Sequence, residues 1–387
     1  DKYSGWYALR DEAFYSEKEI INGKAPSGAD VSWVEEESYF FDLSKWQDKL
    51  LEFYDKNPNF ILPKSRMNEV KSFVKGGLRD LSVSRTSFEW GVKVPNNDKH
   101  IMYVWLDALT NYLSAIGYPD TLENEYVNFW PADIHMVGKD ILRFHAVYWP
   151  AFLMAAELPL PKRIFAHGWW TNEGKKISKS EGNVIDPLEI ISSYGLDQIR
   201  YFLLREVPFG SDGDFSKTAL LARINGDLSN DLGNLCQRVI SMIYKNCNGF
   251  IPRKCEKLND RDIIFYNKSN ALYEKVKNEI DKQSFHEAIK LIWAFISDAN
   301  KYVDEQAPWK LRKTDERRMN DVLWILADTI RKIAIIVQPF MPDSSNKILD
   351  QLSIDISERD FSYLDSKHAI KTNKIDSPSP IFPRIEE

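Results

Sequence analysis

The chain has 387 residues, 43% hydrophobic and 13% aromatic, which suffices for two or three folded domains. Its net charge of −6 argues against DNA or another polyanion as a general partner, because such binding depends on a basic face. The three cysteines, Cys236, Cys247 and Cys255, fit neither a disulfide framework nor a zinc-binding pair, so we expect no structural zinc and no other metal site. The most apolar stretch, 146–156, is too short to cross a membrane.

The first 170 residues predict an insertion followed by an α/β fold. Residues 1–80 mix short aromatic segments with a helix that Ser44 could cap and that runs toward Tyr54. After residue 81, apolar strands alternate with helices, at 101–106, 108–116, 134–138, 141–156 and 164–167. This βαβαβ order predicts a parallel, Rossmann-like sheet, with ligands at the carboxyl ends of its strands.

The remainder of the chain predicts mainly helices. Two short helices separated by Gly195 follow a glycine- and lysine-rich loop within residues 172–215. Spaced apolar residues then predict an all-α bundle, with helices at 218–247, 260–281, 284–305 and 315–338. Residues 355–387 contain three prolines among apolar residues, and we expect this tail to pack back on a surface.

The loop at residues 174–183 has a composition suited to phosphate binding. It contains two lysines, Lys176 and Lys179, two serines, Ser178 and Ser180, and flanking glycines. Ammonium and hydroxyl groups donate to phosphate oxygens, and glycine permits a close approach of the backbone. The alternative is a solvated lysine-rich turn.

The segment Lys176-Ile177-Ser178-Lys179-Ser180 resembles the KMSKS signature of class I aminoacyl-tRNA synthetases. Its flanks, 166–174 and 184–187, resemble the methionyl-tRNA synthetase family in particular. The resemblance extends along essentially the whole chain. Further matching stretches are Gly5-Trp6-Tyr7, Trp46-Gln47-Asp48, Val83-Ser84-Arg85-Thr86, residues 103–108, Val137-Gly138-Lys139-Asp140-Ile141 and Glu305-Gln306-Ala307-Pro308-Trp309.

One family signature, His-x-Gly-His, is formed by none of the six histidines. The resemblance therefore implies that the N-terminal half of the catalytic fold, roughly 100 residues, is missing and that the fragment alone is inactive. It also implies five parts. These are a connective insertion (1–80), the second half of the Rossmann-type domain (81–171), the KMSKS-loop or stem-contact region (172–215), an anticodon-binding helical bundle (216–354) and the tail (355–387).

The resemblance assigns a methionine pocket to Trp105, Ala108, Tyr112, Ile141, His145 and Trp149. Aromatic faces hold a thioether by dispersion and sulfur–aromatic contacts. From spacing alone, an aromatic cluster is more often plain core, and His145 could simply be a buried histidine bonded to a backbone carbonyl. For the nearby Asp107 two roles are open, a cap of the helix that follows it and a part in catalysis.

For ATP, the resemblance implies two sets of residues. Gly138 and Asp140 follow a strand and would meet the ribose and adenylate. Lys176, Ser178, Lys179 and Ser180 would meet the phosphates. Lys176 and Lys179 are the catalytic candidates, because charge grows on the departing pyrophosphate. Magnesium is expected to arrive with ATP.

For tRNA, the resemblance assigns Asn234, Arg238 and Trp309 to the CAU anticodon. Asp227 and Asn230 precede Asn234 at helical spacing and predict one polar helix face, for which a merely solvated face is the alternative. A tryptophan after Pro308 at a helix junction is suited to stacking on an unpaired base.

These features predict a methionine-tRNA ligase that uses methionine, ATP and tRNA(Met). The alternatives are a non-catalytic tRNA-binding or assembly protein derived from such an enzyme and a sister class I enzyme for another apolar amino acid. We expect a cytoplasmic monomer that binds no membrane, with an organellar form as the alternative location.

Overall fold

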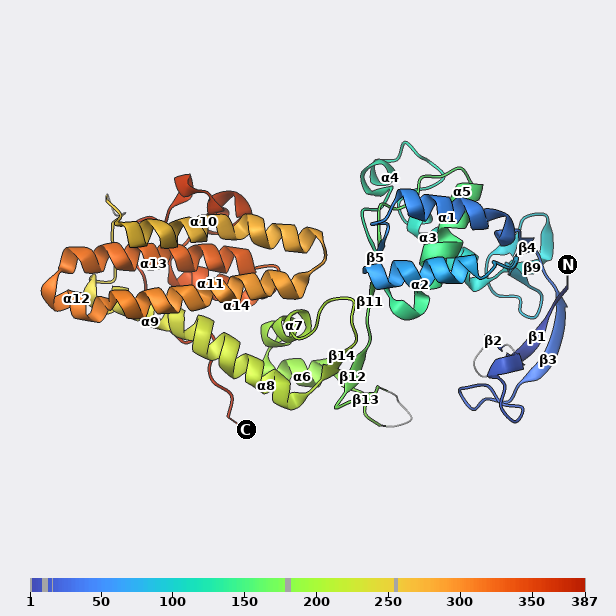
Figure 1. Cartoon of the computed structure of the whole chain (residues 1–387), viewed down its shortest axis with the longest axis horizontal. Helices are drawn as coiled ribbons and strands as arrows, with labels where there is room; N and C mark the ends of the chain where they lie inside the picture. Colours follow the sequence, from blue (N-terminus) through green and yellow to red (C-terminus); the bar gives the residue numbers. More distant parts are fainter. Residues whose placement is uncertain (1, 9–12, 16, 178–181, 254–256, 387) are drawn as a thin grey trace. The chain divides into compact units, whose positions relative to one another are not determined.

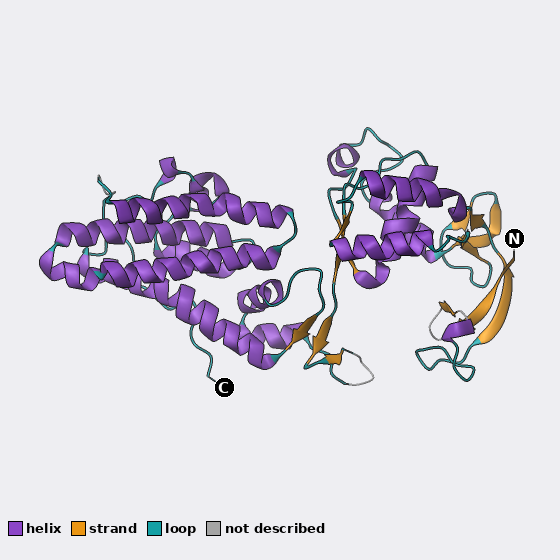
Figure 2. Ribbon diagram, in the orientation of Figure 1, coloured by secondary structure: helices purple, strands orange, loops and turns teal. Residues whose placement is uncertain are grey.

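The computed structural model describes residues 2–8, 13–15, 17–177, 182–253 and 257–386. The chain forms two compact units, Asp1–His167 and Gly168–Glu387. The first combines helices with several small sheets, and the second is mostly helical (Figures 1 and 2).

The core of the first unit is a parallel sheet with the strand order β10-β11-β5. The strands are β10 (His135–Gly138), β11 (Ile164–His167) and β5 (Ile61–Leu62). Helices α1 (Gln47–Lys56), α2 (Lys64–Lys75) and α5 (Trp149–Ala155) bury apolar side chains in the same cluster as these strands. The mixed α/β class predicted from the sequence is confirmed.

Antiparallel strands make up the other sheets of this unit. One sheet consists of β1 (Lys2–Ala8), β2 (Ala13–Tyr15) and β3 (Ser32–Glu37). A two-stranded sheet pairs β4 (Phe40–Phe41) with β6 (Leu81–Ser82). The last contains β7 (Ser84–Arg85), β8 (Lys93–Val94) and β9 (Asn97–Met102). Helix α4 (Asn124–Phe129) and short 3-10 turns also belong to this unit.

The predicted strand at 101–106 is wrong in its extent and its pairing. β9 ends at Met102 and pairs antiparallel, and helix α3 (Val104–Ser114) begins two residues later. Tyr103 is the N-cap residue, so Asp107 lies inside the first turn instead of capping the helix. An apolar run that passes from a strand into a helix has no periodicity that marks the boundary. Likewise, Ser44 lies inside a 3-10 turn and donates to Asp80 rather than capping a helix.

The third parallel strand, β5, lies in the region that the sequence analysis assigned to the insertion. Ile61 pairs with Ile164, and both are fully buried. A two-residue buried strand carries no alternation of polar and apolar residues, so only the pairing reveals it.

The second unit begins with a small sheet and continues as helices. Strands β12 (Trp170–Asn172), β13 (Lys175–Lys176) and β14 (Gly213–Phe215) form the sheet. Helices α6 (Pro187–Tyr194) and α7 (Leu196–Arg205) meet at Gly195, as predicted. Next come α8 (Lys217–Arg223), a π-helical stretch (Ile224–Gly233) and α9 (Asn234–Asn246).

The bundle proper consists of α10 (Asp260–Asp281), α11 (Phe285–Gln306), α12 (Pro308–Thr314), α13 (Glu316–Val337) and α14 (Pro342–Gln351). α13 is the central helix, since every residue from Val322 to Val337 is buried. The tail packs on the bundle through the buried Ile370, Ile375 and Phe382. A buried carboxylate, Asp328 of α13, accepts a hydrogen bond from the backbone N–H of Ile370 at 2.8 Å.

Two simple observations complete the description. In the described part of the chain, every helix is too short or too polar to cross a bilayer. Cys236 and Cys247 are free thiols, and Cys255 lies outside the described residues.

Candidate functional site

The first unit carries a group of aromatic and histidine side chains, which we call the aromatic cluster: Trp105, Tyr112, His135, Phe144, His145 and Trp149. Helix α3 supplies Trp105 and Tyr112, which lie on either side of Ala108 in sequence. The predicted residues of the second segment are Ile141 and His145, which lie between β10 and α5, and Trp149, which is the first residue of α5. This segment contains a 3-10 turn (Lys139–Ile141) and a π-helical stretch (Phe144–Tyr148). The structure therefore brings the two predicted halves of the methionine pocket together.

A hydrogen-bonded chain links the two segments. The Nδ1 atom of His145 lies 3.0 Å from the carbonyl oxygen of Ile141, and its Nε2 atom lies 2.9 Å from the Tyr112 hydroxyl. Burial lowers the pKa of His145, more than the bond to Ile141 raises it, so the ring is neutral near pH 7. A carbonyl can only accept, so the single ring proton is on Nδ1, and Nε2 accepts from Tyr112.

Two members of the aromatic cluster were missed by the sequence analysis. The Phe144 ring stacks on Trp105, with centroids 3.6 Å apart and an interplanar angle of 8°. The ring centroids of His135 and Tyr112 lie 4.2 Å apart. Phe144 and His145 are consecutive, yet both contact Trp105, which a π-helical turn favours because it widens the backbone. Such turns have no simple sequence signal.

The interior of the cluster is apolar enough to leave polar atoms without partners. Among the described residues, Nε2 of His135 and the indole nitrogens of Trp130 and Trp149 are buried and make no hydrogen bond. The ring centroid of Trp130 lies 6.2 Å from that of Trp149 and 6.1 Å from that of His135. An environment of this kind disfavours charge and suits an uncharged ligand group.

Gly138 and Asp140, the residues predicted for the adenylate side, lie together at the carboxyl end of β10. A Cβ atom on Gly138 would lie only 2.5 Å from Oδ1 of Asp140. Any other residue at position 138 would therefore displace the carboxylate.

A hollow of about 690 Å³ opens beside the N-terminus of α3, with Tyr103 and Asp107 in its wall. In the same wall, the guanidinium of Arg85 pairs with the Glu36 carboxylate at 3.1 Å and lies 3.8 Å from the Tyr103 ring centroid. Both charged side chains of this pair are buried. The sequence contains no signal for a pair whose members lie 49 residues apart.

In the second unit, the lysine-rich loop is connected to a short β-hairpin formed by β12 and β13. Glu173 and Gly174 both have positive φ, of 48° and 74°, which suits a tight turn between β12 and β13. Asp214 accepts from the Thr171 hydroxyl at 2.5 Å and the Gly174 N–H at 2.7 Å. These two hydrogen bonds hold the pKa of Asp214 below its usual range.

The base of this loop is closed by two asparagines. The Asn172 amide donates to the carbonyl of Asn183, and the Asn183 amide donates to the carbonyl of Lys176, at 2.8 and 2.9 Å. Lys176 is exposed, and its Nζ lies 6.0 Å from the Trp169 ring centroid. The predicted residues Ser178, Lys179 and Ser180 lie outside the described residues.

The three residues predicted for the anticodon lie on two neighbouring elements of the bundle. Asn234 is exposed at the start of α9, and Arg238 follows one turn later. The Arg238 guanidinium lies 5.5 Å from the ring centroid of Trp309 and donates to Asp304 of α11 at 2.6 Å. Trp309, the second residue of α12, is 43% exposed. The arrangement presents an indole ring and a guanidinium to solvent side by side.

The predicted polar face does not extend back to Asp227. Asp227 accepts from the Tyr201 hydroxyl at 2.6 Å and from Arg223 at 3.2 Å, so its carboxylate joins helices within the unit. The residues from Ile224 to Gly233 are π-helical, with more residues per turn than an α-helix, so the 3.6-residue spacing does not apply there.

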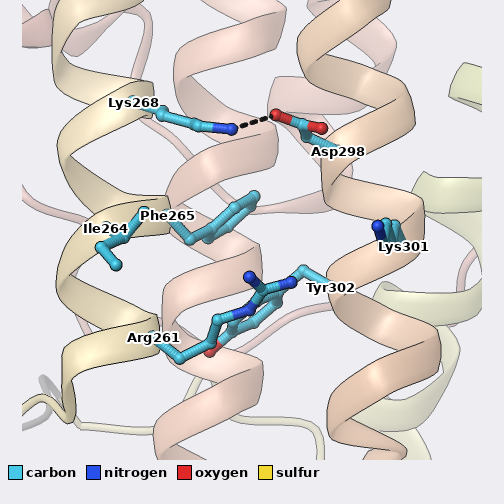
Figure 3. Close-up of a pocket in the computed structure, with 7 residues that line it drawn as sticks. All are labelled: Arg261, Ile264, Phe265, Lys268, Asp298, Lys301 and Tyr302. Carbon is cyan, nitrogen blue, oxygen red and sulfur yellow. Dashed lines mark hydrogen bonds and ion pairs between the residues drawn. The ribbon is translucent and has the colours of Figure 1, made fainter.

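A groove of about 120 Å³ lies between α10 and α11 (Figure 3). Two of its basic side chains face carboxylates on the opposite helix: Lys268 pairs with Asp298 at 2.7 Å, and Arg261 pairs with Glu305. The third, Lys301, lies 3.8 Å from Glu305 on its own helix. Because the charges are compensated, the groove offers no preformed anion site. In the described part of the chain, no three His, Cys, Asp or Glu side chains are arranged to hold a metal ion.

Comparison with known proteins assigns the fold. Residues 2–240 match the family described as tRNA synthetases class I (M), and residues 251–387 match the anticodon binding domain of methionyl tRNA ligase. The α/β fold and its helical bundle are therefore those of a class I tRNA synthetase.

Individual relatives narrow this class. The chain is 56% identical to the methionine–tRNA ligase of Rickettsia felis and 52% identical to that of Brucella suis. It covers 76% and 75% of those proteins, and the alignments include 99% and 100% of the chain. The solved Mycobacterium tuberculosis methionyl-tRNA synthetase in complex with methionyl-adenylate is 48% identical, with a TM-score of 0.93 over 99% of this chain and 77% of that one. The chain belongs to the methionyl-tRNA synthetase family, as its sequence motifs predicted.

Proposed function

We propose that this protein is a methionine-tRNA ligase, which activates methionine with ATP to methionyl-adenylate and transfers the methionyl group to tRNA(Met). The observation that carries the proposal is the chain from Ile141 through His145 to Tyr112 within the aromatic cluster. It joins two segments 33 residues apart that the family resemblance had assigned to one pocket. The family membership of the chain supplies the reaction.

The aromatic cluster suits the methionine side chain. Trp105, Phe144 and Trp149 offer large apolar faces, which hold a polarizable thioether by dispersion and sulfur–aromatic contacts. Neutral His145 uses its Nε2 atom to accept from Tyr112, so the phenolic hydroxyl is fixed as a donor while its oxygen can still accept a hydrogen bond. A lysine or glutamate side chain would have to give up its hydration here without a charged partner.

The remaining substrate groups have separate binding residues. Gly138 and Asp140 would contact the ribose of ATP. Lys176 and Lys179, with Ser178 and Ser180, would contact its phosphates. The methionine carboxylate attacks the α-phosphorus, a new P–O bond forms, and the bond to pyrophosphate breaks. Lysine charge then stabilises the departing pyrophosphate, and magnesium enters with ATP as part of the substrate.

For tRNA, Asn234, Arg238 and Trp309 would read the CAU anticodon from the bundle assigned to residues 216–354. The exposed indole offers a stacking surface for an unpaired base, and the guanidinium beside it offers planar donors. The proposal includes a monomeric protein in the cytoplasm.

Methionine-dependent ATP–pyrophosphate exchange on the full-length protein tests the proposal. Tyr112→Phe removes the hydroxyl at constant ring size, so the KM for methionine should rise about fivefold to tenfold, as expected for one lost hydrogen bond, with the KM for ATP almost constant. Tyr118→Phe is the matched control, since Tyr118 lies in the same unit and packs on Tyr126. Absence of methionine-dependent exchange in the wild type, or equal effects of both substitutions, would contradict the proposal.

A further inference from the structure

The corner that carries Trp309 has a strained backbone. Helix α11 ends at Gln306, and Ala307 links it to α12 with φ of 43° and ψ of 57°, the left-handed conformation. An alanine in that region is strained relative to a helical one, because its Cβ atom comes close to the following carbonyl oxygen. Such a conformation persists only where the surrounding contacts determine it. Trp309 lies two residues after the strained position, so its direction depends on those contacts.

The contacts come from Arg318 in the first turn of α13. Its Nη2 atom donates to Oε1 of Gln306 at 2.5 Å, at the last residue of α11. The same guanidinium donates to Asp262 of α10 through Nη1 at 2.6 Å and Nη2 at 2.8 Å. One planar group thereby joins the ends of three helices at the corner.

Asp262 is the anchor of this arrangement. Its side chain is fully buried and also accepts from the Tyr302 hydroxyl at 2.7 Å. It forms a capping box with Asn259 at the start of α10. Burial by itself would raise the pKa of Asp262, but the hydrogen bonds from Arg318 and Tyr302 outweigh it and lower the pKa, so the carboxylate is charged near pH 7. Figure 3 shows Tyr302 beside Phe265, and these two rings stack with centroids 4.3 Å apart.

The opposite side of the corner faces the candidate anticodon residues. Asp304, two residues before Gln306, binds Arg238, whose guanidinium lies beside the Trp309 ring. The end of α11 is thus tied to Arg238 on one side and to Arg318 on the other. We propose that Gln306 and Arg318 are positioning residues that hold the Trp309 ring in place for an unpaired anticodon base. This inference rests on the proposed function, because it presupposes that Trp309 reads the anticodon.

Gln306→Met is the decisive variant. It removes the acceptor at nearly constant volume, and both hydrogen bonds from Arg318 to Asp262 remain, so the buried pair is not broken. Gln338→Met is the matched control. Gln338 directly follows α13 at the end opposite Arg318, where it donates to the carbonyl of Arg359 at 2.7 Å. Gln306 binds Arg318 at the start of α13, whereas Gln338 follows the other end of this helix, which is about 33 Å long.

The probes are 17-nucleotide anticodon stem-loop RNAs with CAU or UAU in the loop, and the measurement is fluorescence anisotropy with the full-length protein. We expect Gln306→Met to reduce the preference for CAU by roughly fivefold, which is part of the preference that stacking of one base provides. Gln338→Met should keep the wild-type preference. Arg318→Lys should resemble Gln306→Met, because an ammonium cannot reproduce three planar hydrogen bonds.

A double variant separates positioning from general stabilisation. In the Trp309→Ala background, Gln306→Met should have no further effect on the CAU preference, since the group that it positions is gone. A wild-type preference in Gln306→Met, or the same loss with and without Trp309, would overturn the inference. Failure of the proposed function would look different: the wild-type protein would bind the CAU and UAU loops equally, before any substitution is made.

Discussion

His135 makes the stability of the first unit depend on pH. Burial, and to a lesser extent the nearby His145, lowers the pKa of His135 from 6.5 to about 4. Its ring is 5% exposed and packs against Tyr112 and Trp130. In the unfolded chain the ring takes up its proton near pH 6.5, whereas in the folded unit it stays neutral until about pH 4.

The sign of the effect follows from this difference. Between pH 6.5 and 4 the unfolded state binds more protons, so the free energy of unfolding falls as the pH is lowered through this window. Above pH 6.5 the His135 ring is neutral in both states, so the free energy of unfolding is not reduced by its protonation. With pKa values of 6.5 and about 4, the loss is about 2 kcal/mol at pH 5 and approaches about 3 kcal/mol below pH 4.

Urea denaturation followed by tryptophan fluorescence, at pH 7.5 and pH 5, measures the effect. His135→Phe preserves a ring at this position and should weaken the pH dependence by about 2 kcal/mol relative to the wild type. His368→Phe is the control for general changes in charge, because His368 is an exposed histidine in the tail. Equal pH dependence in the wild type and His135→Phe would refute the reasoning. So would an NMR titration that places the His135 pKa near 6.5.

Three further predictions concern the second unit. Trp309→Ala should reduce the tRNA charging efficiency of the full-length protein at least roughly fivefold while ATP–pyrophosphate exchange stays almost unchanged; equal losses for tRNAs with and without C at the first anticodon position would instead indicate a structural tryptophan. Asp328 pairs with Arg331 at 2.8 Å and with Lys332 at 2.9 Å, and Asp328→Asn leaves both cations buried without a carboxylate. Urea denaturation should therefore show that the free energy of unfolding falls by about 3–5 kcal/mol, and a fall below 1 kcal/mol would contradict a stabilising role of this carboxylate. Lys179→Ala should raise the activation barrier of methionine activation by about 3 kcal/mol and change methionine binding little. Equal effects on the rate and on binding would assign the loop to substrate binding.

The helical half of the fold could be predicted closely from the sequence. Expected helices at 260–281, 284–305 and 315–338 correspond to α10, α11 and α13, with boundaries within one residue. Long amphipathic segments repeat the same local signal over many turns, so their type and extent are well defined. The first unit was less predictable: β5 has only two residues, and its partner β11 lies about 100 residues later in the sequence. Pairing of this kind is decided by tertiary contacts that no local pattern contains.

The candidate site shows the same division. The sequence by itself determined the family and supplied the candidate residues of the methionine pocket and the lysine loop, because motifs fix the chemical groups at each position. Only the tertiary structure decided the contacts of these groups. It shows that neutral His145 accepts from Tyr112, that Phe144 and His135 belong to the aromatic cluster, and that Arg318 donates to both Gln306 and Asp262. These properties depend on burial and on distances between residues far apart in the chain, and both exist only once the chain has folded.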